Sequence, residues 1–260
     1  MRAVLIPVCL ALAITACATS PLGRHQLSLF PSSQMQEMGV AAYQEMKNQI
    51  PVSGSSRQQR YVRCVADSIT AQVGGSQAWE VTLFEDDSAN AFALPGGKIG
   101  VHTGLLEVAR NQHQLAAVIG HEVAHVLANH SNERVSQQAL FQTGLQAVQV
   151  LAGATTPAKQ QLLGLLGVGA QVGVLMPFGR TQETEADLLG LDLMAKAGFD
   201  PRESVDLWQN MASQSQGAPP EFLSTHPAHG TRIQNLQGRM NQVVPLYEQA
   251  RSAGRRPNCG

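Results

Sequence analysis

Residues 121–125 read His-Glu-Val-Ala-His and have the clearest capacity for chemistry in this sequence. In a helix, positions i and i+4 share one face, so His121 and His125 can bind a single Zn²⁺ ion. Glu122 lies beside the first histidine and can accept a proton from a water molecule that the zinc activates. The motif is typical of zinc metalloproteases.

The alternative is a pair of surface histidines beside a charge. The predicted helix is apolar around the motif, at Leu115, Ala116, Ala117, Val118, Ile119, Val123, Ala124, Val126 and Leu127. Burying polar groups without partners costs free energy, so a buried helix does not place His, Glu and His at its middle unless they are used. The context therefore favours a metal site.

A catalytic zinc ion takes three protein ligands and keeps one position open for water. Residues 180–187 open a second predicted helix, and Glu183 and Asp187 lie four positions apart on one face of it. We expect Glu183 to bind the metal and Asp187 to accept the second ring N–H of a ligating histidine. Glu185 points elsewhere on this helix and is not an expected ligand. The alternative is an acid-rich helix start that favours the helix dipole, which accounts for Asp187 less well.

The composition bounds the function. A chain of 260 residues is long enough for one domain with a buried core. With 43% apolar residues and a net charge of −1, it is not an intrinsically disordered chain. Because 18 basic residues are balanced by 19 acidic ones, no cationic field attracts phosphate backbones, and nucleic acid is not an expected partner.

The hydrophobic patterns predict the elements that position these residues. Strands are expected at 79–84, 90–94 and 99–102, with a Pro-Gly-Gly-Lys turn before the last. Helices are expected at 34–50, 57–73, 103–110, 112–130, 133–150, 158–176, 181–198, 201–214 and 230–240. The predicted fold is a helix-rich α+β domain with one small antiparallel β-sheet.

The N-terminus has the pattern of an export signal. Residues 1–16 contain Arg2 and then an apolar stretch that is too short to span a bilayer. They end in Ile-Thr-Ala before Cys17, which resembles a bacterial lipobox, so we expect Cys17 to be lipidated. The alternative is an ordinary cleaved signal with an incidental cysteine. Ala18, rather than Asp, indicates the outer membrane under the usual bacterial sorting rule.

These patterns divide the chain into four segments. They are a signal peptide (1–16), a lipidated N-terminus and tether (17–33), a zinc metallopeptidase domain (34–245) and a C-terminal tail (246–260).

Two cysteines remain after Cys9 leaves with the signal and Cys17 is lipidated. An exported compartment is oxidising, so Cys64 and Cys259 are expected to form a disulfide that ties the C-terminal tail to an early helix. The alternative is two free thiols.

Residues 121–125 and 183–187 resemble the gluzincin metallopeptidase family. This family includes prenyl-protein endopeptidases, bacterial heat-shock membrane proteases and the mitochondrial overlapping-activity protease. Within it, the chain is most similar to periplasmic lipoproteins like the beta-barrel assembly-enhancing protease. The resemblance covers about residues 57–240. Residues 90–97 resemble the family's edge strand, which lies along the substrate.

The resemblance implies a zincin-type fold with one Zn²⁺ per chain, bound by His121, His125 and Glu183. Glu122 would be the general base and then the acid toward the leaving amine. Asp187 would lie behind the ligands.

A further similarity is Leu-Ser-Thr-His-Pro at 223–227 with Arg232, which resembles the family's C-terminal His-Pro…Arg element. His226 would lie near the metal. It would stabilise the oxyanion together with Arg232, or cap the zinc as a fourth ligand in a resting state. A plain loop histidine is the third interpretation. Four further histidines match no role and are expected at the surface, namely His102, His113, His130 and His229.

The edge strand makes Asn90, Ala91, Phe92 and Ala93 the expected substrate-binding residues. A substrate that adds as an extended strand is held by main-chain hydrogen bonds, which tolerate many sequences. The alternative is a plain hairpin whose turn uses two glycines.

The apolar, glycine-rich stretch 162–178 is too short and too often interrupted by polar residues to predict a membrane span. It is either a core helical hairpin with 139–152 or a mobile flap over the zinc site that touches lipid or an outer-membrane client.

Together these features predict a zinc metalloendopeptidase, anchored by lipid to the outer membrane and facing the periplasm, that degrades misfolded or unassembled envelope proteins. Expected partners are those clients, the outer membrane and the barrel assembly machinery. Two other classes stay open: a chaperone-like assembly factor with a self-capped zinc site, and a zinc hydrolase of non-peptide bonds such as cell-wall amides.

Overall fold

The computed structural model describes residues 17–151, 178–213, 221–227 and 231–260. The strands are β1 (Cys17–Thr19), β2 (His25–Leu27), β3 (Glu80–Phe84), β4 (Ala91–Leu94) and β5 (Lys98–His102). The helices are α2 (Ser32–Gln49), α3 (Ser56–Thr70), α4 (Leu105–Val108), α5 (Gln112–Leu127), α6 (His130–Leu151), α9 (Arg180–Lys196), α10 (Glu203–Ser213), α11 (Glu221–Thr225) and α12 (Arg232–Ser252). The signal segment, the predicted helix 158–176 and nearly all of the stretch 162–178 lie outside the described residues.

The helix-rich α+β fold class is confirmed, but the three-stranded sheet is mixed rather than wholly antiparallel. Its strand order is β3-β5-β4, with β4 antiparallel and β3 parallel to β5. The tight turn joins β4 to β5, and its Gly96 and Gly97 have φ values of +85° and +71°, which favour glycine. Because β4 occupies one edge of β5, β3 pairs with the opposite edge. There it runs parallel to β5.

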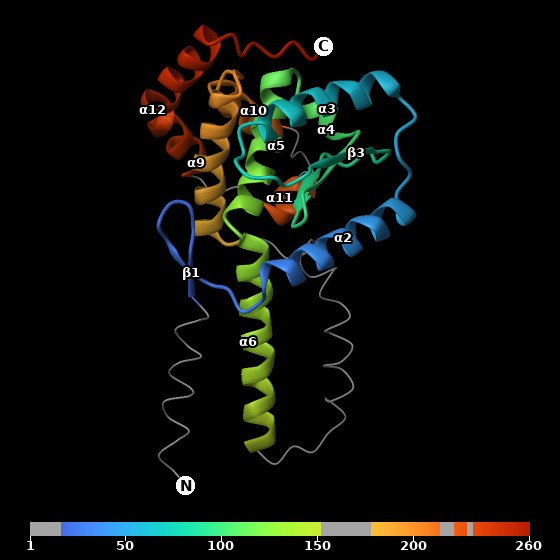
Figure 1. The fold of residues 1–260 in the computed structure, drawn as a ribbon, viewed down its shortest axis with the longest axis vertical. Coiled ribbons are helices and arrows are strands. Elements are labelled where there is room, and N and C mark those ends of the chain that lie inside the picture. Colours follow the sequence, from blue (N-terminus) through green and yellow to red (C-terminus); the bar gives the residue numbers. More distant parts are fainter. Residues whose placement is uncertain (1–16, 152–177, 214–220, 228–230) are drawn as a thin grey trace.

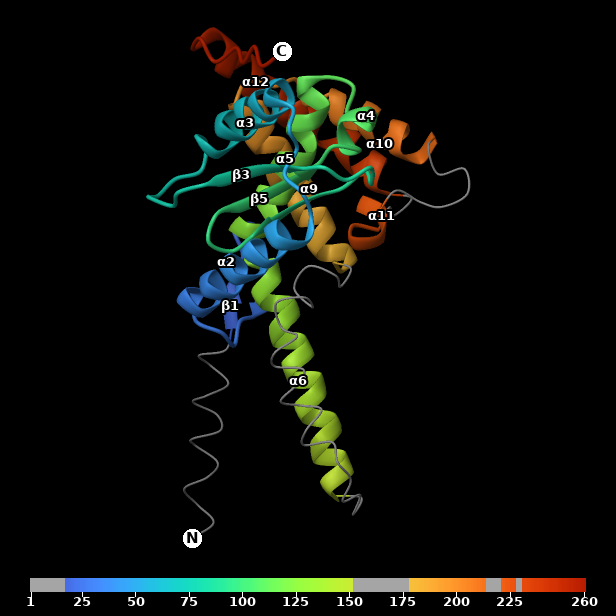
Figure 2. The same ribbon diagram turned by 90° about the vertical axis from the view of Figure 1, so that its right-hand side faces the viewer.

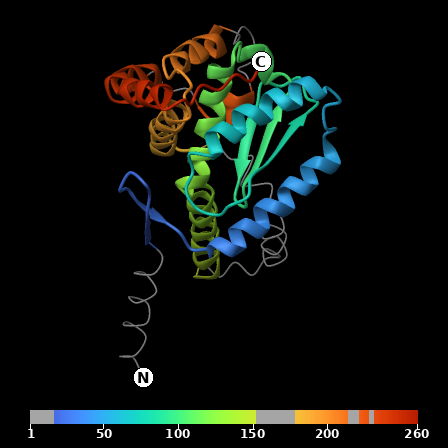
Figure 3. The same cartoon turned by 45° about the horizontal axis from the view of Figure 1, so that its top comes forward.

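Helices cover both faces of this sheet (Figure 3). In β4, Phe92 and Leu94 face a small cluster with Tyr43 of α2. Ala91 and Ala93 face the main core, to which α3 and α5 contribute. All four residues of β4 are buried for this reason.

Helix α5 lies at the centre of the domain and contacts α3, α9, α10 and β4 (Figures 1 and 2). Its apolar residues lie on every side, as expected of a helix that neighbours surround. It contacts α9 most closely at Gly120 and Gly190. A Cβ atom on Gly190 would lie 2.8 Å from the backbone nitrogen of His121, and one on Gly120 would lie 2.9 Å from the carbonyl oxygen of Gly190. Only glycine lets the two backbones approach this closely.

Residues 17–27, assigned to the tether in the sequence, form an antiparallel hairpin of β1 and β2. We call it the N-terminal hairpin. It packs against α6, the helix that projects from the rest of the domain (Figure 1). Just after it, the Leu29 N–H donates to Ser136 Oγ, and Asn132 Nδ2 donates to the carbonyl of Phe30. The segment is therefore attached to the domain.

Cys64 and Cys259 form the expected disulfide, with a Cα–Cα distance of 5.5 Å. The tail also contacts the start of α5, because Gln112 donates to the carbonyl of Pro257 and accepts the N–H of Cys259. Helix α12 continues through residue 245, at which the domain was expected to end. Among the residues described here, no helix is both long and apolar enough to cross a membrane.

The disulfide predicts a specific loss of stability. In a soluble chain that starts at Ala18, Cys259→Ser should lower the free energy of unfolding by about 2–4 kcal/mol, because the bridge restricts the unfolded chain. Urea unfolding measures this. Reductant should lower the wild type to the same stability and leave Cys259→Ser unchanged. Equal stability of oxidised wild type and variant would contradict the bridge.

Candidate metal centre

The metal-binding motif lies in the buried part of α5. The helix begins after Asn111, whose Oδ1 accepts the backbone N–H groups of His113 and Gln114. Ten residues beyond this cap, His121 begins a run that ends at His125, and both histidines are almost fully buried. The sequence therefore places the two imidazoles on one face of the helix that is most completely surrounded by protein.

Four side chains converge at this face: His121, His125, Glu183 of α9 and His226, which follows α11. Each offers one ligand atom, and these atoms all lie within 4.8 Å of one another. The Nε2 atoms of His121 and His125 are 3.0 Å apart. Nδ1 of His226 lies 2.9 Å from Oε1 of Glu183 and 3.2 Å from Nε2 of His121. The structure thus brings the three predicted ligands and His226 together.

The chemistry of these donors fits a zinc ion. Two ring nitrogens 3.0 Å apart can share only one proton, and a carboxylate faces both of them at 3.4–3.5 Å. On the other side of each ring, Nδ1 of His121 meets Asp187, and Nδ1 of His125 meets His130. The lone pairs of the ring nitrogens and of the carboxylate therefore converge on one buried point, where a cation would balance the negative charge. Imidazole and carboxylate are typical zinc ligands, with two histidines and one glutamate a known catalytic set.

Arg232 holds the two carboxylates of α9 in place. Its Nε and Nη2 atoms donate to Asp187 at 2.6 and 2.8 Å, and Nη1 lies 2.7 Å from Glu183 Oε2. The guanidinium lies 3.7 Å from the ring centroid of Trp208. Asp187 in turn lies 3.0 Å from Nδ1 of His121. These contacts fix Asp187 behind the ligand, while a part for Arg232 in oxyanion stabilisation stays a prediction.

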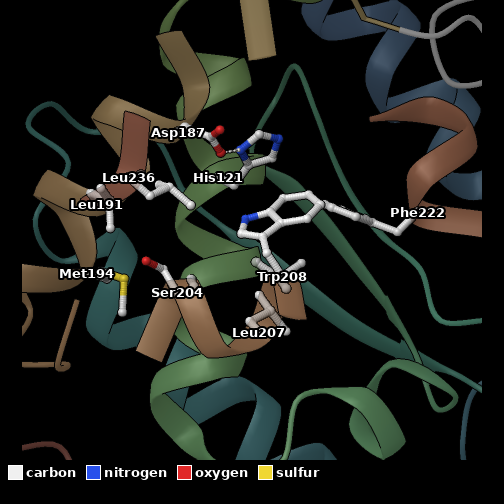
Figure 4. A pocket seen from close by; sticks show the side chains of 12 residues that line it. His121, Asp187, Leu191, Met194, Ser204, Leu207, Trp208, Phe222 and Leu236 are labelled. Carbon is white, nitrogen blue, oxygen red and sulfur yellow. Dashed lines mark hydrogen bonds and ion pairs between the residues drawn. The ribbon is translucent and has the colours of Figure 1, made fainter. Parts of the chain in front are cut away.

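Figure 4 shows the apolar wall behind this arrangement, where Asp187 meets His121 and Trp208 lies between His121 and Leu207. The cavity that these residues line has a volume of about 20 Å³. A site of this size holds a single water molecule and no substrate side chain. The wall is therefore closely packed against His121 and is not a specificity pocket.

The environment sets the protonation of the three carboxyl groups. Burial raises the pKa of Glu122 and so makes it a stronger base. Burial also acts to raise the pKa of Asp187, but the charge of Arg232 and the hydrogen bond with His121 outweigh it and lower that pKa. The pKa of Glu183 falls well below its ordinary value, because neighbouring histidines outweigh the effect of burial. Glu183 and Asp187 are therefore carboxylates.

Glu122 joins the metal centre to the edge of the sheet. Its Oε2 atom accepts the backbone N–H of Ala93 at 3.3 Å, and Oε1 lies 3.2 Å from Nε2 of His226. Since β4 is an edge strand, the N–H of Ala93 points away from β5 and toward the site. The neighbouring outward N–H, that of Ala91, meets the side-chain oxygen of Asn90. Of the predicted substrate residues, Phe92 instead packs its ring beneath α2.

His226 is held between two aromatic rings, neither of which was predicted to be part of the site. The ring of Phe222 stacks on His226 with a centroid distance of 4.5 Å. The ring of Phe178 also stacks on His226, at 5.0 Å, and its centroid lies 3.8 Å from that of His125. Only 2% of the surface of His226 is exposed, so it is not a surface loop histidine. Its position among the ligands favours the resting fourth-ligand interpretation.

Comparison with known proteins identifies the family. The profile of peptidase family M48 matches residues 56–240. The chain belongs to peptidase family M48. The predicted resemblance to a metallopeptidase family is thus confirmed. The expected metal cofactor agrees with this family and with the group of ligands described above.

Individual relatives add detail. This M48 chain is 39% identical over 180 residues to mitochondrial metalloendopeptidase OMA1 of Schizosaccharomyces pombe, covering 68% of this chain and 51% of the relative. It is 29% identical over 220 residues to the beta-barrel assembly-enhancing protease of Yersinia pestis, covering 82% and 45%. For the Escherichia coli protein of that name the identity is 26% over 247 residues, covering 92% and 50%. The chain spans about half the length of these curated relatives.

Some histidines of the M48 chain differ from expectation. The prediction that His102 and His130 lie at the surface is wrong, because both are buried. His113 is partly buried and accepts the N–H of Asp200, and His229 lies outside the described residues. His130 follows Asn129, whose positive φ of 53° ends α5 and turns the chain back toward His125. An asparagine directly after the helix was the one local signal of this contact.

Because the metal ligands come from separate helices, we expect a bound metal ion to stabilise the fold. Removing the metal with a chelator should lower the melting temperature by about 5–10 °C, since binding at a hundredfold excess over Kd adds about 2.7 kcal/mol. Calorimetry with and without added zinc measures this. His125→Leu should show no response to zinc. A wild type that melts at one temperature with and without zinc would contradict the assignment of the ligands.

Proposed function

We propose that the protein is a zinc-dependent endopeptidase that hydrolyses peptide bonds of misfolded or unassembled cell-envelope proteins. The observation that carries the proposal is the joint position of the metal ligands, the buried base Glu122 and the edge strand β4. A binding module needs neither a base with a raised pKa nor a strand edge beside it. Membership of a peptidase family supports the same reaction.

In the proposed hydrolysis, separate residues of this chain bind the substrate, move the proton and orient a metal ligand. An extended substrate adds to the outer edge of β4, where the N–H of Ala93 donates to a substrate carbonyl in place of Glu122. Glu122, released from that contact, takes a proton from the attacking water and later gives it to the leaving amine. When bound, zinc supplies Lewis acidity and lowers the pKa of water. Asp187 keeps the proton of His121 on Nδ1, so that Nε2 faces the metal.

The envelope location rests on the N-terminal sequence. An export signal precedes Cys17 in a lipobox-like context, and a lipid on Cys17 would anchor the chain to the outer membrane. The Cys64–Cys259 disulfide suits an oxidising compartment. Relatives named beta-barrel assembly-enhancing protease support a role in envelope protein quality control, with misassembled clients and the barrel assembly machinery as partners.

One observation favours a second function, a chaperone-like outer-membrane assembly factor with a self-capped zinc site. His226 lies within the ligand group and also contacts Glu122, which would occupy both the metal and the base. In the protease, this contact is a resting state that substrate displaces. In the assembly factor, it is permanent.

Degradation of casein by the soluble chain that starts at Ala18 separates the two. The wild type should cleave casein, and Glu122→Gln should lose at least about a hundredfold in rate while it keeps its zinc, because only the base is removed. Glu107→Gln, at an exposed glutamate of α4, is the matched control and should cleave like the wild type. If wild type and Glu122→Gln both hold zinc and neither cleaves, the protease proposal fails and the assembly factor stands.

A further inference from the structure

The two metal-binding histidines are supported differently. His121 meets the carboxylate of Asp187 directly through Nδ1. His125 instead places its Nδ1 atom 2.9 Å from Nδ1 of His130, the first residue of α6. His130 is fully buried, and its other nitrogen, Nε2, lies 3.2 Å from Oε2 of Glu185. A second carboxylate of α9 thus reaches the second ligand through an intervening imidazole.

The hydrogen bonds leave one arrangement of protons. To bind a metal through Nε2, a neutral His125 must carry its proton on Nδ1 and donate it to His130. Nδ1 of His130 must then be the acceptor, so its own proton lies on Nε2. That proton points at Glu185, which as a carboxylate accepts it. Each step fixes the next, and no histidine in the series needs to be charged.

The carboxylate at the end of this series is held by the N-terminal hairpin. Arg24, in the hairpin, donates through Nε to Oε2 of Glu185 at 2.9 Å. Its two terminal nitrogens donate to the two oxygens of Glu133 on α6, each at 2.7 Å. Gln182 donates to the same Glu133. Arg24 therefore joins the hairpin to α6 and α9 directly beneath the metal centre.

We propose that His130, Glu185 and Arg24 position His125 for the metal, and that the N-terminal hairpin thereby controls the affinity of the site. Arg24 lies seven positions after Cys17, so the segment next to the expected lipid anchor is also the segment that completes the support of a ligand. When the hairpin is docked, Glu185 faces His130 and the ring of His125 is fixed. When it is released, Glu185 loses its arginine and His130 loses a fixed acceptor.

This inference depends on the metal site and not on the substrate proposed above. Its test is zinc affinity, measured on the purified full chain by competition with a chromophoric chelator. That quantity is independent of whether any peptide is cleaved, so the two proposals can fail separately.

His130→Leu should weaken zinc binding about 10- to 100-fold, the range seen when a partner of a metal-binding histidine is removed. His130→Asn keeps an acceptor near the position of Nδ1 and should stay within about threefold of the wild type. His113→Leu is the matched control, because this histidine of α5 contacts Asp200 and Phe199 and no ligand. An unchanged Kd in His130→Leu would overturn the role of His130.

Arg24→Gln tests the hairpin and should weaken zinc binding about three- to tenfold, less than His130→Leu because His130 remains in place. Its control is Arg239→Gln, which removes a different ion pair to α9, that with Asp192. Equal affinities for Arg24→Gln and Arg239→Gln would overturn the coupling to the hairpin.

Nitrogen NMR of the zinc-loaded protein tests the proton arrangement without any substitution. The proposal expects the proton of His130 on Nε2. A proton on Nδ1 of His130 would overturn it, even if a variant of this buried histidine failed to fold.

Discussion

The contact between α5 and α9 at Gly120 and Gly190 is the constraint on which the site depends. At this point each helix presents its backbone, and no side chain separates them. Gly120 directly precedes His121, and Gly190 follows Asp187 by three residues. The short interhelical distance is thus set within one turn of the metal-binding residues, and it lets short carboxylate side chains on α9 reach both imidazoles on α5.

Burial then determines how the charges are arranged. Three carboxyl groups and an arginine lie almost entirely out of water at the site, and such groups are tolerated only when they are paired. Arg232, brought in by the packing of α12 on α9, pairs with Asp187 and Glu183. Aromatic side chains pack around His226, and interactions among these buried groups are stronger than in water. The result is a preorganised set of ligands with one buried base at a strand edge.

The parts of this site that follow a local pattern could be predicted from the sequence. The i, i+4 spacing put His121 and His125 on one face, and the same spacing paired Glu183 with Asp187. Alternation and turn glycines indicated the strands, and two remaining cysteines in an exported chain indicated the disulfide.

The parts that depend on contacts between distant segments could not. Nothing near Gly120 or Gly190 in sequence shows that the two meet. The parallel pairing of β3 with β5 depends on which side of β5 is free, and the burial of His130 depends on the turn at Asn129. The hairpin around Arg24 has the composition of a tether, and its fixed place depends on distant residues of α6 and α9, among them Glu133 and Glu185.

The zinc affinity of Gly190→Ala tests directly whether the close contact between α5 and α9 sets the metal site. Its added Cβ atom would lie 2.8 Å from the backbone nitrogen of His121 and must separate the helices. Gly238→Ala, in α12 with no atom within 4 Å of the new Cβ, is the control and should bind zinc like the wild type. We expect Gly190→Ala to remain helical and to lose at least about tenfold in zinc affinity, a change of about 1.4 kcal/mol. A folded Gly190→Ala with the zinc affinity of the wild type would contradict it.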